Sequence, residues 1–399
     1  MWYGLFMITR ILEAKLRESA KQYPVVSVTG PRQSGKTTLC RKIFPKKPYL
    51  SFEVPDIREL AMQDPRGFLG RYPEGAILDE VQRVPEILSY LQGIVDERKK
   101  NGLYILSGSQ NLLLLRSIRQ SLAGRTAVLK LLPFSVEEIR SLIQKRAADD
   151  IVHTGFFPRI FDQKIDPSDA MRDYVATYVE RDVRQIINVK NLSSFQKFLK
   201  LCAGRIGQIL NLSSISNDLG VSHTTIKEWM SVLEASYVVF LLPAYYRNWK
   251  KRIIKAPKMY FYDTGLAAYL LGIEKSSQMS RDPLRGALFE NFVVIEFLKY
   301  FWSQGREAPL YFFRDNHGNE VDLIIEKARR IMGIEIKAGQ TIHEEFFKGL
   351  DFLKRLAGKD MLGRAVVYGG KNEFSREDVS IHSYLNVLDC YQRIQKFIE

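Results

Sequence analysis

The sequence predicts an α/β fold: a parallel sheet with crossover helices, then a mainly helical region, then a second and smaller α/β region. The first observation behind this prediction is a set of four short apolar runs, separated by stretches long enough for helices, at residues 25–29, 75–80, 103–109 and 126–132. The second is a change to a mainly helical pattern after about residue 135. Because strands that alternate with helices form parallel sheets, the carboxyl ends of the four runs are expected along one edge, where ligands bind.

The length and composition indicate a globular protein with more than one domain. The chain has 399 residues, of which 46% are hydrophobic and 26% are charged, so a disordered or collagen-like chain is excluded. At roughly 150 residues per domain, two or three domains are expected. We place three regions at 1–150, 151–280 and 281–399, the last boundary at a polar break near Lys275 and Pro283.

The charge balance points to a polyanionic partner. Lys and Arg number 59 and Asp and Glu number 45, a net charge of +14, which favours nucleic acid first and an anionic membrane surface second. No stretch reaches the ~18 continuous apolar residues of a membrane span, and the N-terminus lacks the pattern of a signal peptide. The three cysteines lie far apart, so neither a disulfide framework nor a cysteine zinc site is expected. We therefore expect a soluble cytoplasmic protein with no membrane partner.

A nucleotide-binding motif follows the first apolar run. Residues 30–37, GPRQSGKT, match the pattern G-x-x-x-x-G-K-[ST] between a predicted strand and a predicted helix. The glycines let backbone N–H groups wrap phosphates, Lys36 would contact the β and γ phosphates, and the Thr37 hydroxyl would ligate Mg²⁺. The expected ligands are ATP and Mg²⁺, held by Gly30, Pro31, Arg32, Gln33, Ser34, Gly35, Lys36, Thr37 and Thr38.

Polar residues at the ends of the next two runs complete this predicted site. Asp79 and Glu80 end the second run, an arrangement in which the first carboxylate holds Mg²⁺ and the second activates the attacking water. Ser107, Ser109 and Asn111 follow the third run, where a polar side chain can sense the γ-phosphate. The sequence does not determine which of the three does so. We assign Ser109 to the nucleotide site as the candidate sensor.

Arg125 precedes the fourth run and is a candidate catalytic residue. An arginine in this place can act as an arginine finger toward the nucleotide of its own chain or of a neighbouring subunit. The alternative is an ordinary surface or salt-bridging arginine.

These residues resemble a known family. The stretches GPRQSGKTTL, ILDEVQ, LSGSQN, SLAGR, YVERDVR, FYDTGLAAYLLGI and PLRGALFENFVV are similar to those of prokaryotic AAA+-type ATPases that carry a C-terminal domain of unknown function. The resemblance extends from about Leu12 to Gly339. It implies an ATP-binding AAA+ module, a winged helix and a C-terminal restriction-endonuclease-like α/β fold.

The middle region combines a helix-turn-helix pattern with high positive charge. Residues 212–242 indicate a helix, a tight turn, a second helix and a strand, the spacing of a winged helix-turn-helix. Between Arg181 and Tyr260 the chain has thirteen Lys or Arg residues and four acids. We expect DNA contacts at Thr224, Thr225, Lys227, Arg247, Lys250, Lys251 and Arg252. The alternative is that this region packs on the ATPase module; Trp229 is expected in the core.

Carboxylates and a lysine in the C-terminal region have the order of a nuclease site. Asp322 lies in the run EVDLIIE, and Glu335-Ile336-Lys337 follows after twelve intervening residues. On a hairpin this spacing places two carboxylates and a lysine at one end of a sheet, where the carboxylates hold Mg²⁺ and the lysine activates water against a phosphodiester. With Glu290 in the preceding helix, the set resembles the PD-(D/E)xK nuclease core of archaeal-type Holliday junction resolvases. The alternative is a nuclease-like fold retained only for binding or assembly.

The sequence therefore predicts an ATPase whose nucleotide state controls contact with DNA, as a homo-oligomer with an attached nuclease-like domain. It does not specify the form of the DNA, and branched DNA is one candidate. The alternative function is a nucleotide-dependent switch that binds protein partners in signalling or defence. A kinase is a weaker alternative, because Asp79-Glu80 supplies a water-activating base and no acceptor pocket is evident.

Overall fold

The computed structural model describes residues 8–109, 121–179, 192–246 and 256–396. Their contacts divide the chain into two compact units. The first unit is formed by the described residues up to Phe134 with two short later segments, Ala235–Tyr237 and Phe301–Glu307. The second unit is formed by Ser135–Glu234, Val238–Tyr300 and Ala308–Glu399, less the residues outside the described ranges. Each unit is described by itself.

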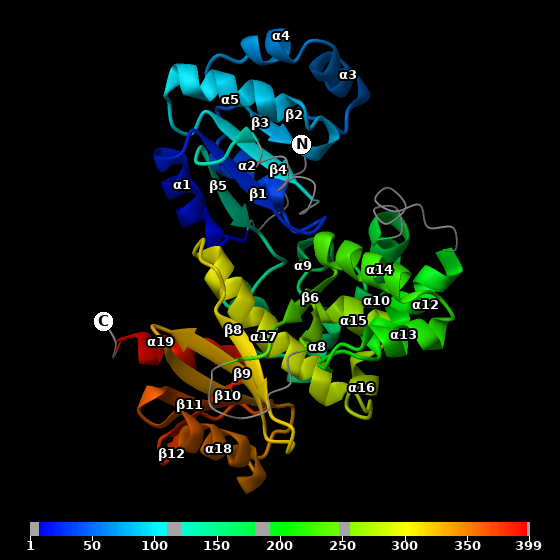
Figure 1. The fold of residues 1–399 in the computed structure, drawn as a ribbon, viewed down its shortest axis with the longest axis vertical. Coiled ribbons are helices and arrows are strands. Elements are labelled where there is room, and N and C mark those ends of the chain that lie inside the picture. The colour runs from blue at the N-terminus through cyan, green and yellow to red at the C-terminus, as the bar shows by residue number, and fades with distance from the viewer. Residues whose placement is uncertain (1–7, 110–120, 180–191, 247–255, 397–399) are drawn as a thin grey trace. The chain divides into compact units, whose positions relative to one another are not determined.

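The first unit is built on a parallel sheet of five strands in the order β2-β3-β4-β1-β5 (Figure 1). The four predicted runs form β1, β3, β4 and β5, and β2 adds a short edge strand. The elements are α1 (Leu12–Gln22), β1 (Val25–Thr29), α2 (Lys36–Ile43), β2 (Tyr49–Ser51), α3 (Pro55–Gln63), α4 (Pro65–Gly70), β3 (Ile77–Asp79), η1 (Val81–Arg83), α5 (Ile87–Arg98), β4 (Tyr104–Gly108) and β5 (Thr126–Lys130).

The central strand β1 explains the order of this sheet. Its sequence VVSVT is rich in β-branched residues, and all five side chains are buried between β4 and β5. Apolar residues of α1 and α2 cover one side of the sheet, and those of α3, α4 and α5 form a second core. Because all strands run the same way, the residues after β1, β3 and β4 gather at one edge.

The second unit begins with helices whose ends are marked in the sequence. Asp166, for example, accepts hydrogen bonds from the N–H groups of Ser168 and Asp169 and is followed by Pro167, which favours the start of α10. The helices are α7 (Arg140–Ile143), α8 (Ala148–Thr154), α9 (Pro158–Gln163), α10 (Pro167–Tyr174), η2 (Val175–Val179), α12 (Leu192–Ala203), α13 (Leu212–Leu219), α14 (His223–Ala235), α15 (Thr264–Leu270), α16 (Ser276–Met279) and α17 (Arg285–Ser303).

Helices α13 and α14 follow the predicted helix-turn-helix spacing. Asn211 caps α13, and Gly220 at φ +65° ends it in a left-handed conformation. Trp229 lies on the buried side of α14 and packs against Phe195 and Phe198, as expected for a core residue. An antiparallel pair, β6 (Val239–Leu242) and β7 (Lys258–Phe261), follows the two helices.

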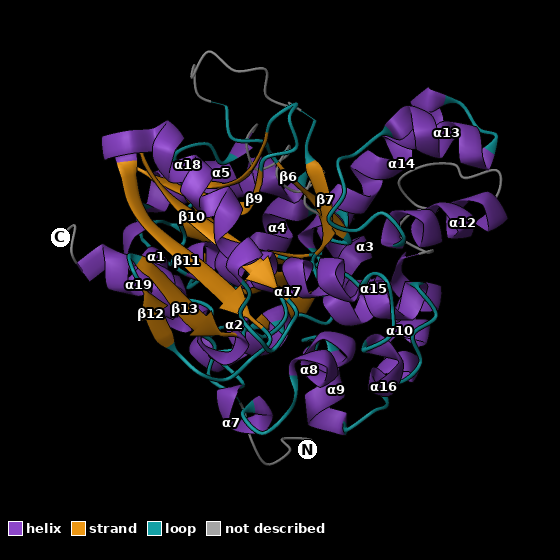
Figure 2. Ribbon diagram, turned by 90° about the horizontal axis from the view of Figure 1, so that it is seen from below, coloured by secondary structure: helices purple, strands orange, loops and turns teal. Residues whose placement is uncertain are grey.

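The C-terminal part of the second unit contains a six-stranded mixed sheet in the order β12-β13-β11-β10-β9-β8. The predicted hairpin is formed by β9 and β10, and α18 packs on the face of β9, β10 and β11 (Figure 2). The elements are β8 (Leu310–Arg314), β9 (Glu320–Lys327), β10 (Arg330–Lys337), η3 (Glu344–Phe347), α18 (Lys348–Ala357), η4 (Gly358–Asp360), β11 (Met361–Tyr368), β12 (Phe374–Arg376), β13 (Val379–Ser383), η5 (Tyr384–Asn386) and α19 (Asp389–Lys396).

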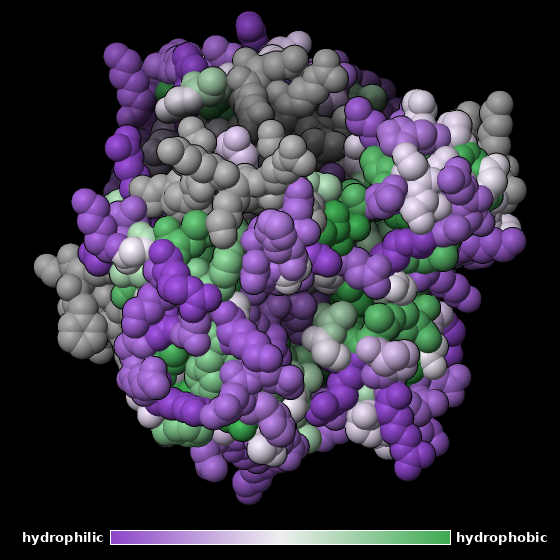
Figure 3. All heavy atoms as spheres, turned by 60° about the horizontal axis from the view of Figure 1, so that its bottom comes forward, coloured by the Kyte–Doolittle hydropathy of each residue, from purple (hydrophilic) through white to green (hydrophobic). Residues whose placement is uncertain are grey.

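The predicted boundary near residue 280 falls inside the second unit, because strand β7 and helix α17 are joined by hydrogen bonds. Asn291 accepts from the N–H of Phe261 at 2.6 Å and donates to its carbonyl at 2.8 Å. The face drawn in Figure 3 is mostly hydrophilic, with apolar side chains in small separate groups. Among the described helices, none has the length and apolar composition to cross a membrane.

Candidate functional site

The loop between β1 and α2 has the backbone conformation that its glycines predict. Gly30 has φ +149°, and a Cβ atom there would lie 2.0 Å from the carbonyl oxygen of Leu131. Gln33 and Gly35 follow at φ +60° and +93°, in the left-handed region. The hydroxyl of Ser34 is buried and has no hydrogen-bond partner among the described residues. A narrow turn with an unsatisfied buried hydroxyl, ahead of a helix N-terminus, fits the phosphates of a nucleotide.

Arg10 holds this loop through hydrogen bonds, and no sequence pattern singled it out. Its guanidinium donates to the carbonyl oxygen of Ser34 at 2.8 Å and to that of Leu132 at 2.6 Å, and the side chain is buried. One cation therefore ties the nucleotide loop to the segment after β5.

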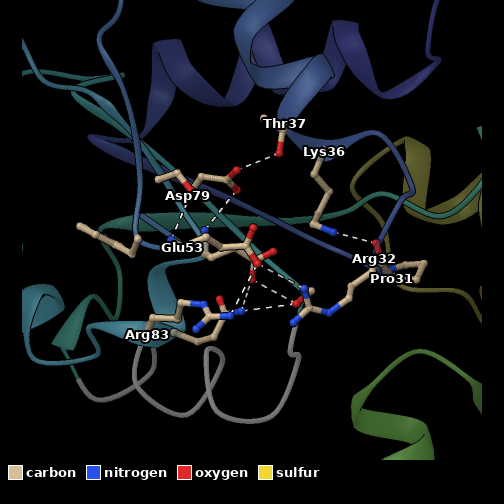
Figure 4. Close-up of polar contacts among 12 residues, drawn as sticks. Pro31, Arg32, Lys36, Thr37, Glu53, Asp79 and Arg83 are labelled. Carbon is tan, nitrogen blue, oxygen red and sulfur yellow. Dashed lines mark hydrogen bonds and ion pairs between the residues drawn. The ribbon is translucent and has the colours of Figure 1, made fainter. Parts of the chain in front are cut away.

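Lys36 and Thr37 open helix α2 and face different partners (Figure 4). The ammonium group of Lys36 donates to the carbonyl oxygens of Gly30 and Pro31, at 2.9 and 2.7 Å. Burial lowers the pKa of Lys36, and the Glu80 and Asp79 carboxylates oppose this shift. The hydroxyl of Thr37 donates to Asp79 Oδ2 at 2.9 Å. The hydroxyl and carboxylate predicted to hold Mg²⁺ therefore lie in direct contact.

Asp79 is held by donors on both neighbouring strands. Tyr49 on β2 donates its hydroxyl to Oδ2 at 2.6 Å, and Ser107 on β4 donates to Oδ1. Burial raises the pKa of the Tyr49 hydroxyl, and the hydrogen bond to Asp79 raises it further, so this hydroxyl acts as a donor. Ser107 thus supports Asp79, while Ser109 contacts the next acid.

Glu80 has a left-handed backbone, with φ +52°, directly after strand β3. Its carboxylate accepts hydrogen bonds from Gln82 and, at 3.2 Å, from the hydroxyl of Ser109. Gln82 also lies 3.4 Å from Ser109. The predicted base and the predicted sensor are therefore neighbours, and Gln82, which the sequence did not single out, joins them.

A cluster of two arginines and a glutamate lies beside the loop (Figure 4). Glu53, after β2, is 3.6 Å from Arg32 of the loop and 3.6 Å from Arg83 of η1. Arg32 is buried, whereas about half of the Glu53 side chain is exposed. Two arginines thus reach the nucleotide edge of the sheet with one shared carboxylate between them. Thr38, also assigned to the nucleotide, is exposed on α2.

Arg125 lies beside the amino-terminal end of strand β1, whereas the nucleotide loop follows the carboxyl-terminal end of that strand. It directly precedes β5, and its carbonyl oxygen accepts from the N–H of Val25, the first residue of β1. Its guanidinium forms two hydrogen bonds with Asp96, at 2.5 and 2.8 Å. Because the loop follows the other end of β1, Arg125 lies away from the nucleotide loop of its own chain. The pair with Asp96 fits the alternative of a salt-bridging arginine. A contact with the nucleotide of a neighbouring subunit stays a prediction.

The predicted DNA-contacting residues are only partly within the described chain. Thr224 and Lys227 are exposed on the first turns of α14, and Thr225 is half-buried beside the hydroxyl of Ser222. The ribbon residues Arg247, Lys250, Lys251 and Arg252, and the sensor alternative Asn111, lie outside the described residues.

The predicted nuclease residues come together at one end of the hairpin. The Lys337 ammonium lies 3.0 Å from Asp322 and 2.6 Å from Glu335, and the N–H of Ile336 donates to Asp322 at 2.8 Å. Glu290 on α17 is bound instead by Lys258, at 2.8 Å. Lys258, one of the thirteen Lys or Arg residues of the middle region, is buried here.

The charged groups of this cluster shift one another's pKa values. Burial and the charge of Asp322 raise the pKa of Glu335 well above its ordinary value. Burial acts to raise the pKa of Asp322 as well, but Lys337 and Lys258 hold it below its ordinary value. Burial alone would lower the pKa of Lys258, yet the carboxylates of Glu290, Asp322 and Glu320 outweigh burial and raise it. Glu335, with a raised pKa, and Asp322, with a lowered pKa, therefore lie at the same end of the sheet.

The distinctive stretch FYDTG has a structural explanation. Asp263 is buried and accepts hydrogen bonds from the N–H groups of Phe156 at 2.8 Å and Leu266 at 3.2 Å. Gly265 lies so close to the end of α8 that an added Cβ would be 2.8 Å from the Thr154 carbonyl oxygen. This aspartate caps α15 and fixes the chain around Phe156.

Three family models match successive parts of the chain. An AAA domain matches residues 22–140, a domain of unknown function (DUF8612) matches residues 145–277, and another domain of unknown function (DUF4143) matches residues 285–388. Together they span most of the described chain.

Relatives from other organisms match most of the chain. The uncharacterized protein Rv2008c of Mycobacterium tuberculosis is 31% identical over 373 residues, which cover 92% of this chain and 81% of the relative. The uncharacterized protein MJ1544 of Methanocaldococcus jannaschii is 23% identical over 352 residues, covering 80% and 75%. Among solved structures, the Walker-type ATPase of Pyrococcus abyssi has a TM-score of 0.43 and 16% identity, covering 65% of this chain and 94% of that one.

The matched AAA domain coincides with the nucleotide loop and the Thr37–Asp79–Glu80 geometry, and the mycobacterial relative extends the match across nearly the whole chain. The chain therefore belongs to the family of AAA-type P-loop ATPases that carry a C-terminal DUF4143 domain.

Proposed function

We propose that this protein hydrolyses ATP with Mg²⁺ at the edge of its first sheet and uses the nucleotide state to control contact with DNA. The observation that carries the hydrolytic part is the hydrogen bond between Thr37 and Asp79, with Glu80 as the next residue. A magnesium-binding hydroxyl and carboxylate with an adjacent general base form the arrangement that hydrolysis of a nucleoside triphosphate needs.

The chain's own residues have separate tasks in this proposal. Backbone N–H groups of the loop and the Lys36 ammonium bind the phosphates, while Thr37 and Asp79 hold the metal ion. When bound, Mg²⁺ neutralises charge on the phosphates. Glu80 accepts a proton from the attacking water, and Gln82 and Ser109 orient its carboxylate.

Two substitutions separate binding from hydrolysis. Lys36→Ala should abolish binding of a fluorescent ATP analogue and ATP hydrolysis together, because the phosphates lose their cation. Glu80→Gln should retain binding within about threefold and lower the turnover rate at least about a hundredfold, since only the base is lost. Full ATP hydrolysis by Lys36→Ala would overturn the assignment.

The DNA part of the proposal is supported by charge and exposure. The chain carries a net charge of +14, and Lys197, Lys200 and Lys227 are exposed in the region of α12 to α14. Phosphate contacts require such exposed cations and weaken as salt rises. The start of α14, with Thr224 exposed, is the element proposed to reach bases.

The ATPase rate with single-stranded, duplex and four-way-junction DNA, at low and moderate salt, tests this part. Stimulation by one form that is lost as salt rises supports DNA-coupled hydrolysis. A rate indifferent to every form would favour the second function, a nucleotide-dependent switch for protein partners. Lys227→Ala should reduce the stimulation, and Lys21→Ala, on a helix of the first unit, is the control.

The C-terminal domain is proposed to be nuclease-like. The observation in favour is that Asp322, Glu335 and Lys337 converge although they lie on two strands. Mg²⁺-dependent cleavage of single-stranded, duplex or branched DNA, lost in Glu335→Ala, is the activity expected of this cluster in a form of the chain that admits the metal ion. Absence of cleavage of all these forms, with and without ATP, even in a chain whose carboxylates bind the metal ion, would retire it.

A further inference from the structure

Lys258 is a buried cation within the C-terminal carboxylate cluster. Only 3% of its side chain is exposed. Its ammonium lies 2.8 Å from Glu290 and 2.6 Å from Glu320, which come from α17 and β9. Lys258 itself belongs to strand β7, within residues 145–277 rather than within the matched C-terminal domain. The cluster is therefore composed of residues from two regions of the chain.

Strand β7 is fixed where it carries Lys258 into the cluster. Asn291 brackets the peptide of Phe261 with two hydrogen bonds, and Tyr260 donates its hydroxyl to Glu290. The Lys258 ammonium also lies 5.5 Å from the ring centre of Phe312. Because its strand and its carboxylate partner are both held, Lys258 is a fixed part of the site and differs from a mobile surface lysine.

Each of the four carboxylates that a metal ion would need already has a lysine partner. Lys258 pairs with Glu290 and Glu320, while Lys337 pairs with Asp322 and Glu335. A divalent ion requires several oxygen ligands at about 2.0–2.6 Å, and a fixed ammonium among those oxygens repels it. Within the described ranges, no three His, Cys, Asp or Glu side chains are grouped to hold a metal ion. The carboxylates as arranged do not fit the magnesium ion predicted from the sequence.

We infer that Lys258 takes the place of a divalent cation in this cluster, so that the resting chain binds no such ion there and the site opens to metal only when Lys258 is removed. The metal-binding part of this inference is independent of the proposed function. It rests on the proposed nuclease-like role only for the expectation that a metal-loaded site would cleave DNA. Lys258 thus becomes a determinant of the site supplied from outside the C-terminal domain.

The test is a titration of the full chain with Mn²⁺ in the absence of nucleotide, in which isothermal titration calorimetry measures binding. Wild type and Asp322→Asn should give the same binding curve, because no ion binds at Asp322 in either. Lys258→Met should gain a site with a Kd at least about tenfold tighter than any Asp322-dependent binding of wild type. Adding Asp322→Asn to Lys258→Met should remove the new site.

Lys299→Met is the matched control. Lys299 is also a buried lysine of the second unit and lies 2.7 Å from Glu296, so its loss similarly leaves a buried carboxylate without this cation. It should create no Asp322-dependent Mn²⁺ site. If Lys258→Met does not fold, Lys258→Gln takes its place, and millimolar Mn²⁺ should restore the fold of either variant.

Three results would overturn the inference: an Asp322-dependent Mn²⁺ site in wild type as tight as in the variant, no such site in a folded variant, or no rescue of an unfolded one. Cleavage assays on the same proteins keep the two proposals apart. A variant that binds Mn²⁺ without cutting DNA would retire the nuclease function and leave the role of Lys258 intact.

Discussion

The hydroxyl of Tyr49 donates a 2.6 Å hydrogen bond to Asp79, the carboxylate that also receives the Thr37 hydroxyl. Tyr49→Phe removes this donor and leaves the ring in place. We expect the Mg²⁺ concentration for half-maximal ATP hydrolysis to rise about tenfold, because a metal-binding carboxylate that loses its supporting hydrogen bond is less well oriented. Steady-state ATPase rates across a Mg²⁺ series measure this.

Tyr104→Phe is the matched control for that substitution. The Tyr104 hydroxyl is buried in the same unit and has no hydrogen-bond partner among the described residues. Its removal should leave the Mg²⁺ dependence unchanged. An equal shift in both variants would show that the hydrogen bond to Asp79 is not responsible.

Loss of Arg10 should destabilise the first unit. Arg10→Met leaves the carbonyl oxygens of Ser34 and Leu132 without their buried donor, at a cost of about 2–3 kcal/mol in the free energy of unfolding. Chemical denaturation measures the change. Lys15→Met, which removes only a surface pair with Glu18, should cost less than about 1 kcal/mol. Equal losses would argue against the anchoring role.

Asp263 is expected to matter for folding and not for chemistry. Asp263→Ala leaves the N–H groups of Phe156 and Leu266 unsatisfied in a buried place and should cost about 2–4 kcal/mol. Asp263→Asn keeps one acceptor oxygen and should cost less. A folded alanine variant of wild-type stability would contradict the cap, and thermal denaturation provides the comparison.

The raised pKa of Glu335 predicts a pH dependence of stability. Burial and the Asp322 charge raise this pKa, so the folded chain keeps a proton that the unfolded chain loses. This contribution is complete below the ordinary carboxyl pKa and is lost as pH rises through the raised value. Glu335→Gln is neutral at every pH, so its unfolding free energy should decline less toward alkaline pH than that of wild type.

The carboxylate Asp322 should behave in the opposite way. Its pKa is lowered, with Lys337 and Lys258 outweighing burial, so its contribution is lost as pH falls through the lowered value. Asp322→Asn should therefore weaken the decline in stability at acid pH. Urea denaturation at a series of pH values tests both variants, and profiles parallel to wild type would contradict the opposite shifts.

A mixing experiment tests Arg125 as a finger acting on a neighbouring subunit. Arg125→Ala should lower ATP hydrolysis with little change in thermal stability, because its partner Asp96 lies at the surface. Lys36→Ala should be inactive alone. Mixed oligomers of the two should regain activity, since one subunit keeps the nucleotide loop and the other keeps Arg125. If the mixed oligomers recover no ATP hydrolysis, or if Asp96→Ala lowers ATP hydrolysis as much as Arg125→Ala does, Arg125 acts only through its surface ion pair with Asp96.

The sequence predicted those elements whose signals are local. The nucleotide loop, the ends of β3 and β4 and the β9–β10 hairpin follow from short motifs and apolar runs. Strand β2 was missed because three residues at a sheet edge give no periodic pattern. Tyr49 lies on that strand, so its contact with Asp79 was missed with it.

The remaining site residues depend on partners far away in the chain. Arg10 bonds carbonyl groups 24 and 122 residues later, and nothing in its local sequence distinguishes it from a surface arginine. Lys258 is one of the thirteen basic residues of the middle region, and its sequence context does not show that its partners are Glu290 and Glu320, more than thirty residues later. Spacing along the chain carries no information about such encounters.

The first unit is discontinuous along the chain, and this affects its synthesis. The Thr29 hydroxyl lies 2.9 Å from that of Tyr237, and Lys130 lies 4.1 Å from the ring centre of Trp302. At ~5–20 residues per second, the ribosome delivers Trp302 roughly 8–34 s after residue 134. The nascent ATPase sheet must wait for these late segments, so a chaperone that shields the end of β1 and β5 during this interval would raise the yield of native protein.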